Sequence, residues 1–254
     1  QRFGESHHCL GEPASACTVR EGAGAHILLI GDSNAVMLRG MFESMAERHD
    51  LTLSLSVKAA CSWKRGYEYD AKQDQELCLR LQDDVHERLV DELDPDIVIA
   101  VDVRGGRTVT ALEFGAADPE VDRAVRDATD RSVADMEAAD QPMLVIEPLP
   151  RAVNTENPLD CLARAEFVED CRFINRGPNW LEEHLRELES ENDLLHVADL
   201  DRLACPLDPI CDPVVDGTVM WWDEAHLSRD GALSIEDGVW SYLVVNDLIA
   251  PANQ

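Results

Sequence analysis

A serine stands at the junction between an apolar run and a helix-like segment near the start of the chain. The apolar run is HILLI (residues 26–30), and it ends at the tetrapeptide GDSN (residues 31–34), after which residues 35–49 show helical spacing. In open α/β sheets, functional sites form beyond the carboxyl ends of the strands. The Ser33 hydroxyl is therefore expected to be exposed beside free backbone N–H groups that can hold an oxyanion. The alternative interpretation is that a polar residue of this tetrapeptide only caps the helix.

A candidate base for Ser33 lies near the other end of the chain, where Asp223 and His226 are separated by three positions. This spacing lets the carboxylate hold one imidazole nitrogen while the other nitrogen faces outward. An aspartate-oriented histidine is the group that activates a serine nucleophile. The alternative is that a polar residue of this segment caps the last helix and His226 has no role. The two motifs together are much less expected by accident than either motif alone.

The elements that must position these residues alternate between strands and helices along the chain. The strand-like apolar runs are residues 26–30, 51–57, 96–103, 142–149 and 194–200. The segments with helical spacing are residues 35–49, 76–93, 119–139, 179–190 and 231–249. Such alternation predicts an α/β fold, with a mainly parallel five-stranded sheet covered by helices on both faces. We predict one domain over residues 26–250, preceded by a disulfide-pinned N-terminal extension, residues 1–25.

The charge balance narrows the class of partner. The chain has 51 acidic against 22 basic residues, which gives a formal net charge of −29 at pH 7. Such a surface repels phosphate backbones, so we predict no nucleic-acid partner. A hydrophobic content of 45% is typical of a globular domain. No run approaches the roughly 18 apolar residues that span a membrane, and no signal peptide is recognisable, so we expect a mature secreted protein or a soluble piece of a longer one.

The cysteines indicate the redox compartment. The eight cysteines fall into four sequence-local couples, Cys9/Cys17, Cys61/Cys78, Cys161/Cys171 and Cys205/Cys211. An even number in local couples favours disulfides and an oxidising compartment, although other pairings, or free buried thiols in a cytosolic protein, are alternatives. No couple has C-x-x-C spacing, and the acidic residues lack the spacing of a calcium loop. We predict no metal site and no cofactor.

The GDS turn and the Asp223–His226 segment together resemble the SGNH, or GDSL-like, hydrolase superfamily. Gly31-Asp32-Ser33 resembles its first sequence block, and Asp223-Glu224-Ala225-His226 resembles its last. More narrowly, CPLDPIC (residues 205–211) followed by a D-x-x-H-L-S segment resembles the extracytoplasmic SGNH domain fused to acyltransferase-3 membrane proteins, which O-acylate cell-envelope glycans. The resemblance implies the SGNH fold, a flavodoxin-like three-layer α/β/α sandwich.

The resemblance also implies roles for the two motifs. Ser33 would be the nucleophile, His226 the general base and acid, and Asp223 the carboxylate that orients the histidine. The reaction would transfer an acyl group, expected to be acetyl, to a hydroxyl of a carbohydrate or glycolipid, or to water. The acyl donor would be delivered by a membrane acyltransferase-3 domain, and the protein would lie outside the cytoplasm, tethered to that domain.

The sequence departs from the superfamily pattern at two oxyanion-hole positions. Ala60 stands where the second block has glycine, which is a mild change because a backbone N–H needs no glycine. The third strand lacks the asparagine of the third block, so its donor is missing or is replaced by Asn34 or Arg104. Asp102 at the end of that strand is a candidate for substrate contact, or alternatively for a salt bridge.

The missing donor bears on the kind of reaction. Removing one oxyanion donor costs about 10²–10³ in rate, and a transferase with a slow water reaction tolerates this better than a hydrolase. Two alternatives remain at this stage: a secreted carbohydrate or lipid esterase that uses the same residues, and a catalytically weak glycan-binding domain.

Overall fold

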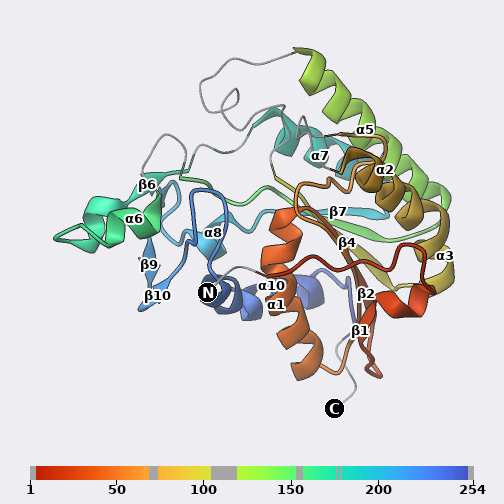
Figure 1. Cartoon of the computed structure of the whole chain (residues 1–254), viewed down its shortest axis with the longest axis horizontal. Helices are drawn as coiled ribbons and strands as arrows, with labels where there is room; N and C mark the ends of the chain where they lie inside the picture. The colour runs from red at the N-terminus through yellow and green to blue at the C-terminus, as the bar shows by residue number, and fades with distance from the viewer. Residues whose placement is uncertain are drawn as a thin grey trace.

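A six-stranded sheet in the order β1-β3-β2-β4-β5-β7 runs through the middle of the protein (Figure 1). The computed structural model describes residues 4–68, 74–103, 119–152, 157–175, 177 and 179–250. The strands of this sheet are β1 (Thr18–Arg20), β2 (His26–Gly31), β3 (Thr52–Val57), β4 (Ile97–Val101), β5 (Met143–Ile146) and β7 (Leu195–Ala198). All pairs are parallel except that of β1 with β3.

The predicted α/β fold with a mainly parallel sheet is confirmed, with one difference at the edge. The five parallel strands are those expected, and their order is that of a flavodoxin-like sheet. The prediction of five strands in total was wrong because β1 adds an antiparallel edge strand from residues 18–20. A three-residue strand carries too short a pattern to stand out in the sequence. The division into an extension and a domain stays a prediction.

The strands are continuously apolar because both faces of the sheet are covered. In β2, Ile27 and Leu29 face one core cluster, whereas Leu28 and Ile30 face the other. Helices on the first face are α1 (Ser33–Arg48), α9 (Arg229–Ser234) and α10 (Glu236–Val245). Helices on the second face are η2 (Val85–Leu89), α3 (Val90–Leu93), α5 (Pro119–Ala138) and α7 (Trp180–Glu191). Helix α2 (Gln75–Asp84) leads into η2, and its Cys78 and Leu81 form a small cluster with Cys61. None of the helices in the described ranges is long and apolar enough to cross a bilayer.

Two of the predicted helices are interrupted. The helix expected over residues 76–93 consists of α2, the π-helical turn η2 and α3 in unbroken succession. The helix expected over residues 231–249 consists of α9 and α10, which meet at Ile235. The apolar spacing follows the whole segment in both cases, so it does not reveal where the helix geometry changes.

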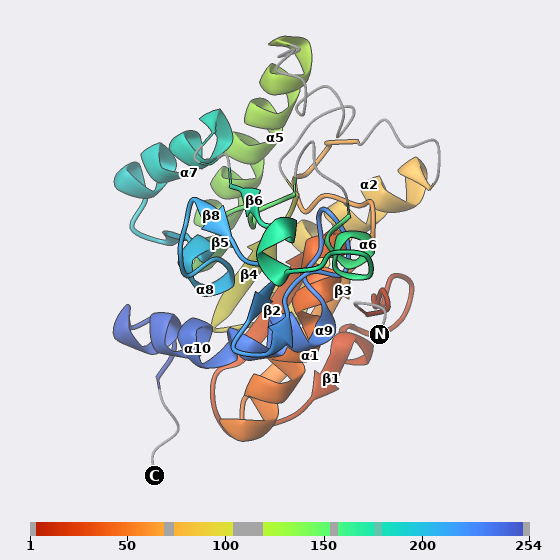
Figure 2. The same ribbon diagram turned by 90° about the vertical axis from the view of Figure 1, so that its left-hand side faces the viewer.

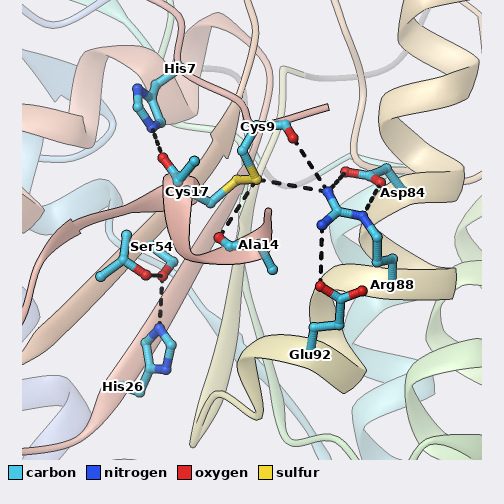
Figure 3. Close-up of a disulfide and its surroundings, with 11 residues drawn as sticks. His7, Cys9, Ala14, Cys17, His26, Ser54, Asp84, Arg88 and Glu92 are labelled. Atoms are coloured by element: carbon cyan, nitrogen blue, oxygen red, sulfur yellow. Dashed lines mark hydrogen bonds and ion pairs between the residues drawn. A yellow bond between two sulfur atoms is a disulfide. The ribbon is translucent and has the colours of Figure 1, made fainter. Parts of the chain in front are cut away.

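The N-terminal segment is pinned to the second face of the sheet. The disulfide Cys9–Cys17 closes a loop that contains the short helix η1 (Ala14–Cys17). Arg88 donates a hydrogen bond to the Cys9 carbonyl oxygen and forms an ion pair with Asp84 (Figure 3). The loop is therefore fixed both covalently and through the helical segment that follows β3.

Two excursions leave the carboxyl ends of β5 and β7 and lie together on one side of the molecule (Figure 2). Their elements are α6 (Pro158–Leu162), η3 (Val168–Cys171), β6 (Phe173–Ile174), α8 (Asp201–Ala204), β8 (Ile210–Cys211), β9 (Val214–Val215) and β10 (Thr218–Val219). The disulfides Cys161–Cys171 and Cys205–Cys211 close one loop in each excursion, and β6 pairs with β8. With Cys61–Cys78, all four neighbour pairings predicted from the sequence are present.

Candidate active site

The turn between β2 and α1 holds Ser33 at the first position of the helix. Gly31 has a φ of +135°, and a Cβ there would lie 1.8 Å from the Val101 carbonyl oxygen on β4, so only glycine fits. Asp32 is the N-cap residue, and its Oδ1 accepts a hydrogen bond of 2.7 Å from the Asn34 N–H. The capping role considered in the sequence analysis is thus filled by Asp32, which leaves the partly exposed Ser33 hydroxyl for another partner.

That partner is His226. The distance between Ser33 Oγ and His226 Nε2 is 2.8 Å. On the other side of the ring, Nδ1 lies 2.9 Å from both carboxylate oxygens of Asp223. Because a carboxylate only accepts hydrogen bonds, Nδ1 carries the proton and Nε2 accepts from the serine hydroxyl. The structure therefore brings the two sequence motifs, 190 or more residues apart, into one hydrogen-bonded chain.

The Asp223–His226 segment is a turn that closes on itself. Asp223 Oδ1 also accepts hydrogen bonds of 2.8 Å from the backbone N–H groups of Ala225 and His226. Ser228, and not Asp223, caps the following helix α9, because its Oγ accepts from the Gly231 N–H. Helix capping and orientation of the histidine are thus done by different residues of the same segment.

Contacts from the excursion that follows β5 hold this turn in place. Trp221 is fully buried, and its ring meets the edge of Phe173 from β6 with centroids 5.1 Å apart. The Ala152 N–H donates a 2.9 Å hydrogen bond to the Glu224 carbonyl oxygen. The excursion that follows β5 therefore braces the loop that carries His226.

The electrostatics favour an ionised Asp223. Burial by itself raises the pKa of Asp223, but the hydrogen bonds from the His226 ring and from the backbone N–H groups of Ala225 and His226 outweigh it. The net effect is a lowered pKa, so the carboxylate keeps its charge next to the imidazole. The Asp223 and His226 side chains are 24% and 17% exposed, which leaves the ring reachable from solvent.

The candidate oxyanion donors fall into three groups. The Asn34 side chain is buried and donates its Nδ2 to Asp32 Oδ1 at 3.2 Å, so it turns toward the cap. Arg104 lies outside the described residues. Within the described part of the chain, no acceptor is bonded to the backbone N–H groups of Ser33 and Ala60. Ala60 is exposed and has a φ of +62°, the left-handed region, which explains physically why glycine suits this position.

Asp102 forms a salt bridge, which was the alternative to substrate contact in the sequence analysis. Its carboxylate is 5% exposed, and Oδ2 accepts a 2.7 Å hydrogen bond from the Lys64 ammonium, which is 2% exposed. Ser62 donates a second hydrogen bond to the same oxygen. Contact with substrate would require the Asp102 carboxylate to face solvent at the edge of the sheet. It is instead buried behind the turn that carries Ser33.

Lys64 was not selected in the sequence analysis. The sequence holds one signal for it, because only Lys58, Lys64 and Lys72 are lysines among 22 basic residues. Lysine is almost never fully buried unless it is paired, so a buried Lys64 requires a partner of opposite charge. Its partner could not be read from the sequence because Lys64 and Asp102 are far apart in the chain.

In the described ranges, no three His, Cys, Asp or Glu side chains lie close enough together to hold a metal ion.

Residues 4–240 match the protein family described as "SGNH domain (fused to AT3 domains)". The chain belongs to this family. The match covers nearly the whole chain, and it includes both the Ser33 turn and the Asp223–His226 turn. In the family, this kind of domain is joined to an AT3 domain.

Solved structures similar to this SGNH domain share its fold. The periplasmic domain of a lipopolysaccharide acetyltransferase from Salmonella ser. Paratyphi A superposes with a TM-score of 0.67 at 16% sequence identity, covering 95% of this chain and 91% of that chain. Est24, a carbohydrate acetylesterase from Sinorhizobium meliloti, superposes with a TM-score of 0.52 at 13% identity, covering 87% and 99% respectively. No curated protein matches the sequence.

Proposed function

We propose that this SGNH domain transfers an acyl group, acetyl in the simplest case, to a hydroxyl of a cell-envelope carbohydrate or glycolipid. The observation that carries the proposal is the hydrogen-bonded chain from Ser33 through His226 to Asp223, with distances of 2.8 and 2.9 Å. This is the arrangement that makes a serine hydroxyl nucleophilic at neutral pH.

The reaction proceeds in two halves through an acyl-serine. His226 Nε2 takes the Ser33 proton as Oγ bonds to the acyl carbon, and the protonated ring then gives that proton to the departing group of the donor. In the second half, His226 takes the proton of the acceptor hydroxyl as its oxygen attacks the ester carbon. The protonated ring then returns this proton to Ser33 Oγ as the bond between Oγ and the acyl carbon breaks. Asp223 stabilises the imidazolium in both halves. The Ser33 and Ala60 N–H groups are the donors we assign to the oxyanion.

Three observations support this proposal: the first two favour acyl transfer over simple hydrolysis, and the last two favour a location outside the cytoplasm. The family is one whose SGNH domains are fused to AT3 domains, which supports a membrane-embedded partner domain as the source of the acyl donor. The similar Salmonella domain is periplasmic and belongs to an acetyltransferase. Four disulfides are typical of an oxidising compartment. The esterase alternative uses the same acyl-serine with water as acceptor. The identity of the acceptor therefore distinguishes an esterase from a transferase.

A partition experiment tests the proposal. The protein is mixed briefly with p-nitrophenyl acetate, an activated acetyl ester, and intact mass is followed with time. We expect one acetyl group to accumulate and to be lost faster when a saccharide acceptor is added, with acetyl-saccharide as the product. Loss at one rate, with acetate as the sole product whatever saccharide is added, would support the esterase and contradict transfer. If no acetyl group is found on the protein and no acetate is released, both alternatives would be contradicted.

Asp223→Asn is expected to lower the rate of acetylation by about 10³–10⁴ while leaving ester binding nearly unchanged. An amide at this position can donate to Nδ1, which turns the ring into the tautomer whose Nε2 carries a proton and cannot accept one from Ser33. The measurement is the burst rate against ester concentration. Glu224→Gln, an exposed neighbour on the same turn, is the control. Equal rates for the two variants would remove Asp223 from the proposed mechanism.

A further inference from the structure

Directly behind Ser33 lies a buried group of two carboxyls and one ammonium. Asp32, Asp102 and Lys64 are 1%, 4% and 2% exposed, which puts all three out of contact with bulk water. Lys64 Nζ donates to Asp102 Oδ2 at 2.7 Å. The Val103 N–H donates to Asp102 Oδ1 at 2.9 Å and to Asp32 Oδ2 at 3.1 Å, so the two carboxyl groups lie side by side and are hydrogen-bonded to each other. The group links the segment after β3, the end of β4 and the start of α1.

A hydrogen bond between two carboxyl groups needs a proton on one of them, because two carboxylates have no donor between them. The ammonium of Lys64 and the hydroxyl of Ser62 both donate to Asp102, which favours the charge there. The proton therefore resides on Asp32. Its Oδ1 remains an acceptor for the Asn34 N–H at 2.7 Å, and its Oδ2 accepts from the Val103 N–H at 3.1 Å while it donates to Asp102.

We propose that Asp32 is a positioning residue for Ser33: a neutral carboxylic acid that caps α1 and donates a hydrogen bond to the Asp102–Lys64 pair. In this state Lys64, Asp102 and Asp32 together carry no net charge. The neutral cap keeps negative charge away from the start of α1, where the N–H of Ser33 must stabilise an oxyanion. An ionised Asp32 would oppose the developing negative charge one residue away. This inference rests on the function proposed above.

The directions of the pKa shifts agree with this geometry. Burial, the charge of Asp102 and the hydrogen bond to Asp102 raise the pKa of Asp32 well above its usual range. Burial also tends to raise the pKa of Asp102, but the Lys64 charge and the hydrogen bonds from Asp32, Lys64 and Ser62 lower it overall. The charged and titratable groups that face Asp32 are Asp102, directly after β4, Lys64, which is paired with Asp102, and His226 on the far side of Ser33.

The first test is the pH dependence of folding. The pKa of Asp32 is about 4 in the unfolded chain and is raised in the folded protein. At pH values between these two, Asp32 holds a proton in the folded state that it lacks in the unfolded chain. The folded state therefore loses stability as pH rises through this window. Relative to Asp32→Asn, the unfolding equilibrium constant of the wild type is expected to increase about tenfold per pH unit there. Asp237→Asn, which changes a carboxyl of 80% exposure in the first turn of α10, is the control. It keeps Asp32, so the wild type measured relative to this variant should show no such slope.

The second test is the acetylation rate of Ser33 by p-nitrophenyl acetate across pH. The wild-type rate is expected to fall at alkaline pH, and Asp32→Asn should lack this fall because its amide supplies the same acceptor and donor without a charge. Asp32→Ala, which has neither, should lose about 10² in rate at every pH, and the rescue by asparagine distinguishes positioning from mere packing.

Two results would overturn the inference. One is a pH slope of stability that is the same for wild type and Asp32→Asn, because Asp32 would then be ionised in the folded protein. The other is loss of acetylation in Asp32→Asn as severe as in Asp32→Ala, because the charge itself would then be required. If the stability slope is present but the wild type is never acetylated, the neutral acid is supported, whereas the proposed function and the positioning role fail together.

Discussion

Ser33→Ala is expected to lower the rate of acetylation by p-nitrophenyl acetate about 10⁶-fold. The variant removes the only oxygen that can bond to the acyl carbon in this mechanism, the Ser33 Oγ that lies 2.8 Å from His226 Nε2. Intact mass should show one acetyl group on the wild type and none on the variant. This is the largest effect that the structure predicts.

The Ser33→Ala substitution should change the stability of the fold very little. Ser33 Oγ contacts His226, whereas Asp32 provides the cap of α1. The free energy of unfolding of the variant should therefore lie within about 1 kcal/mol of that of the wild type. Ser44→Ala, a serine farther along the same helix, is the matched control and should be acetylated at the wild-type rate. Acetylation of Ser33→Ala at an unchanged rate would show that another group is the nucleophile, and the proposed function would fail.

Lys64→Met is expected to cost about 3–5 kcal/mol of unfolding free energy at neutral pH. Methionine has a similar length but no charge, so Asp102 would remain buried without its ion-pair partner, and the ammonium's contact with the Trp63 ring, 4.9 Å from the centroid, would also be lost. The measurement is chemical denaturation at several pH values.

The pH dependence of this loss has a defined sign. In the wild type the pKa of Asp102 is lowered, so its ionisation adds stability that is present above the unfolded pKa and is lost as pH falls through the folded pKa. Without Lys64 the pKa of Asp102 should rise above the unfolded value, and the variant should then lose stability as pH rises from about 4.

Lys58→Met provides the comparison for a pair near the surface. Lys58 lies 3.3 Å from Asp74, whose side chain is 60% exposed, so this variant should lose no more than about 1 kcal/mol. Equal losses for the two lysine variants would mean that the Lys64–Asp102 pair is not a buried contact in solution.

The sequence by itself determined the layers of the fold and the two ends of the candidate site. Uninterrupted apolar runs such as residues 26–30 are needed only where a strand is buried on both faces, so they identify the parallel strands. Gly31 ends the first of these runs because its backbone passes too close to β4 for a side chain. The spacing of Asp223 and His226 follows from the geometry of a single turn, which is a local property.

Only the tertiary structure decided which residues from distant parts of the chain come into contact. The 2.8 Å contact between Ser33 and His226 depends on how α1 and the segment before α9 pack on the same face of the sheet, and no local pattern encodes that distance. The same holds for Asp102, whose position at the end of a strand allowed either substrate contact or a salt bridge. Only the fold brings Lys64 and Asp32 to it, because all three lie at the carboxyl edge of adjacent strands β3, β2 and β4, joined by buried hydrogen bonds over long sequence separations.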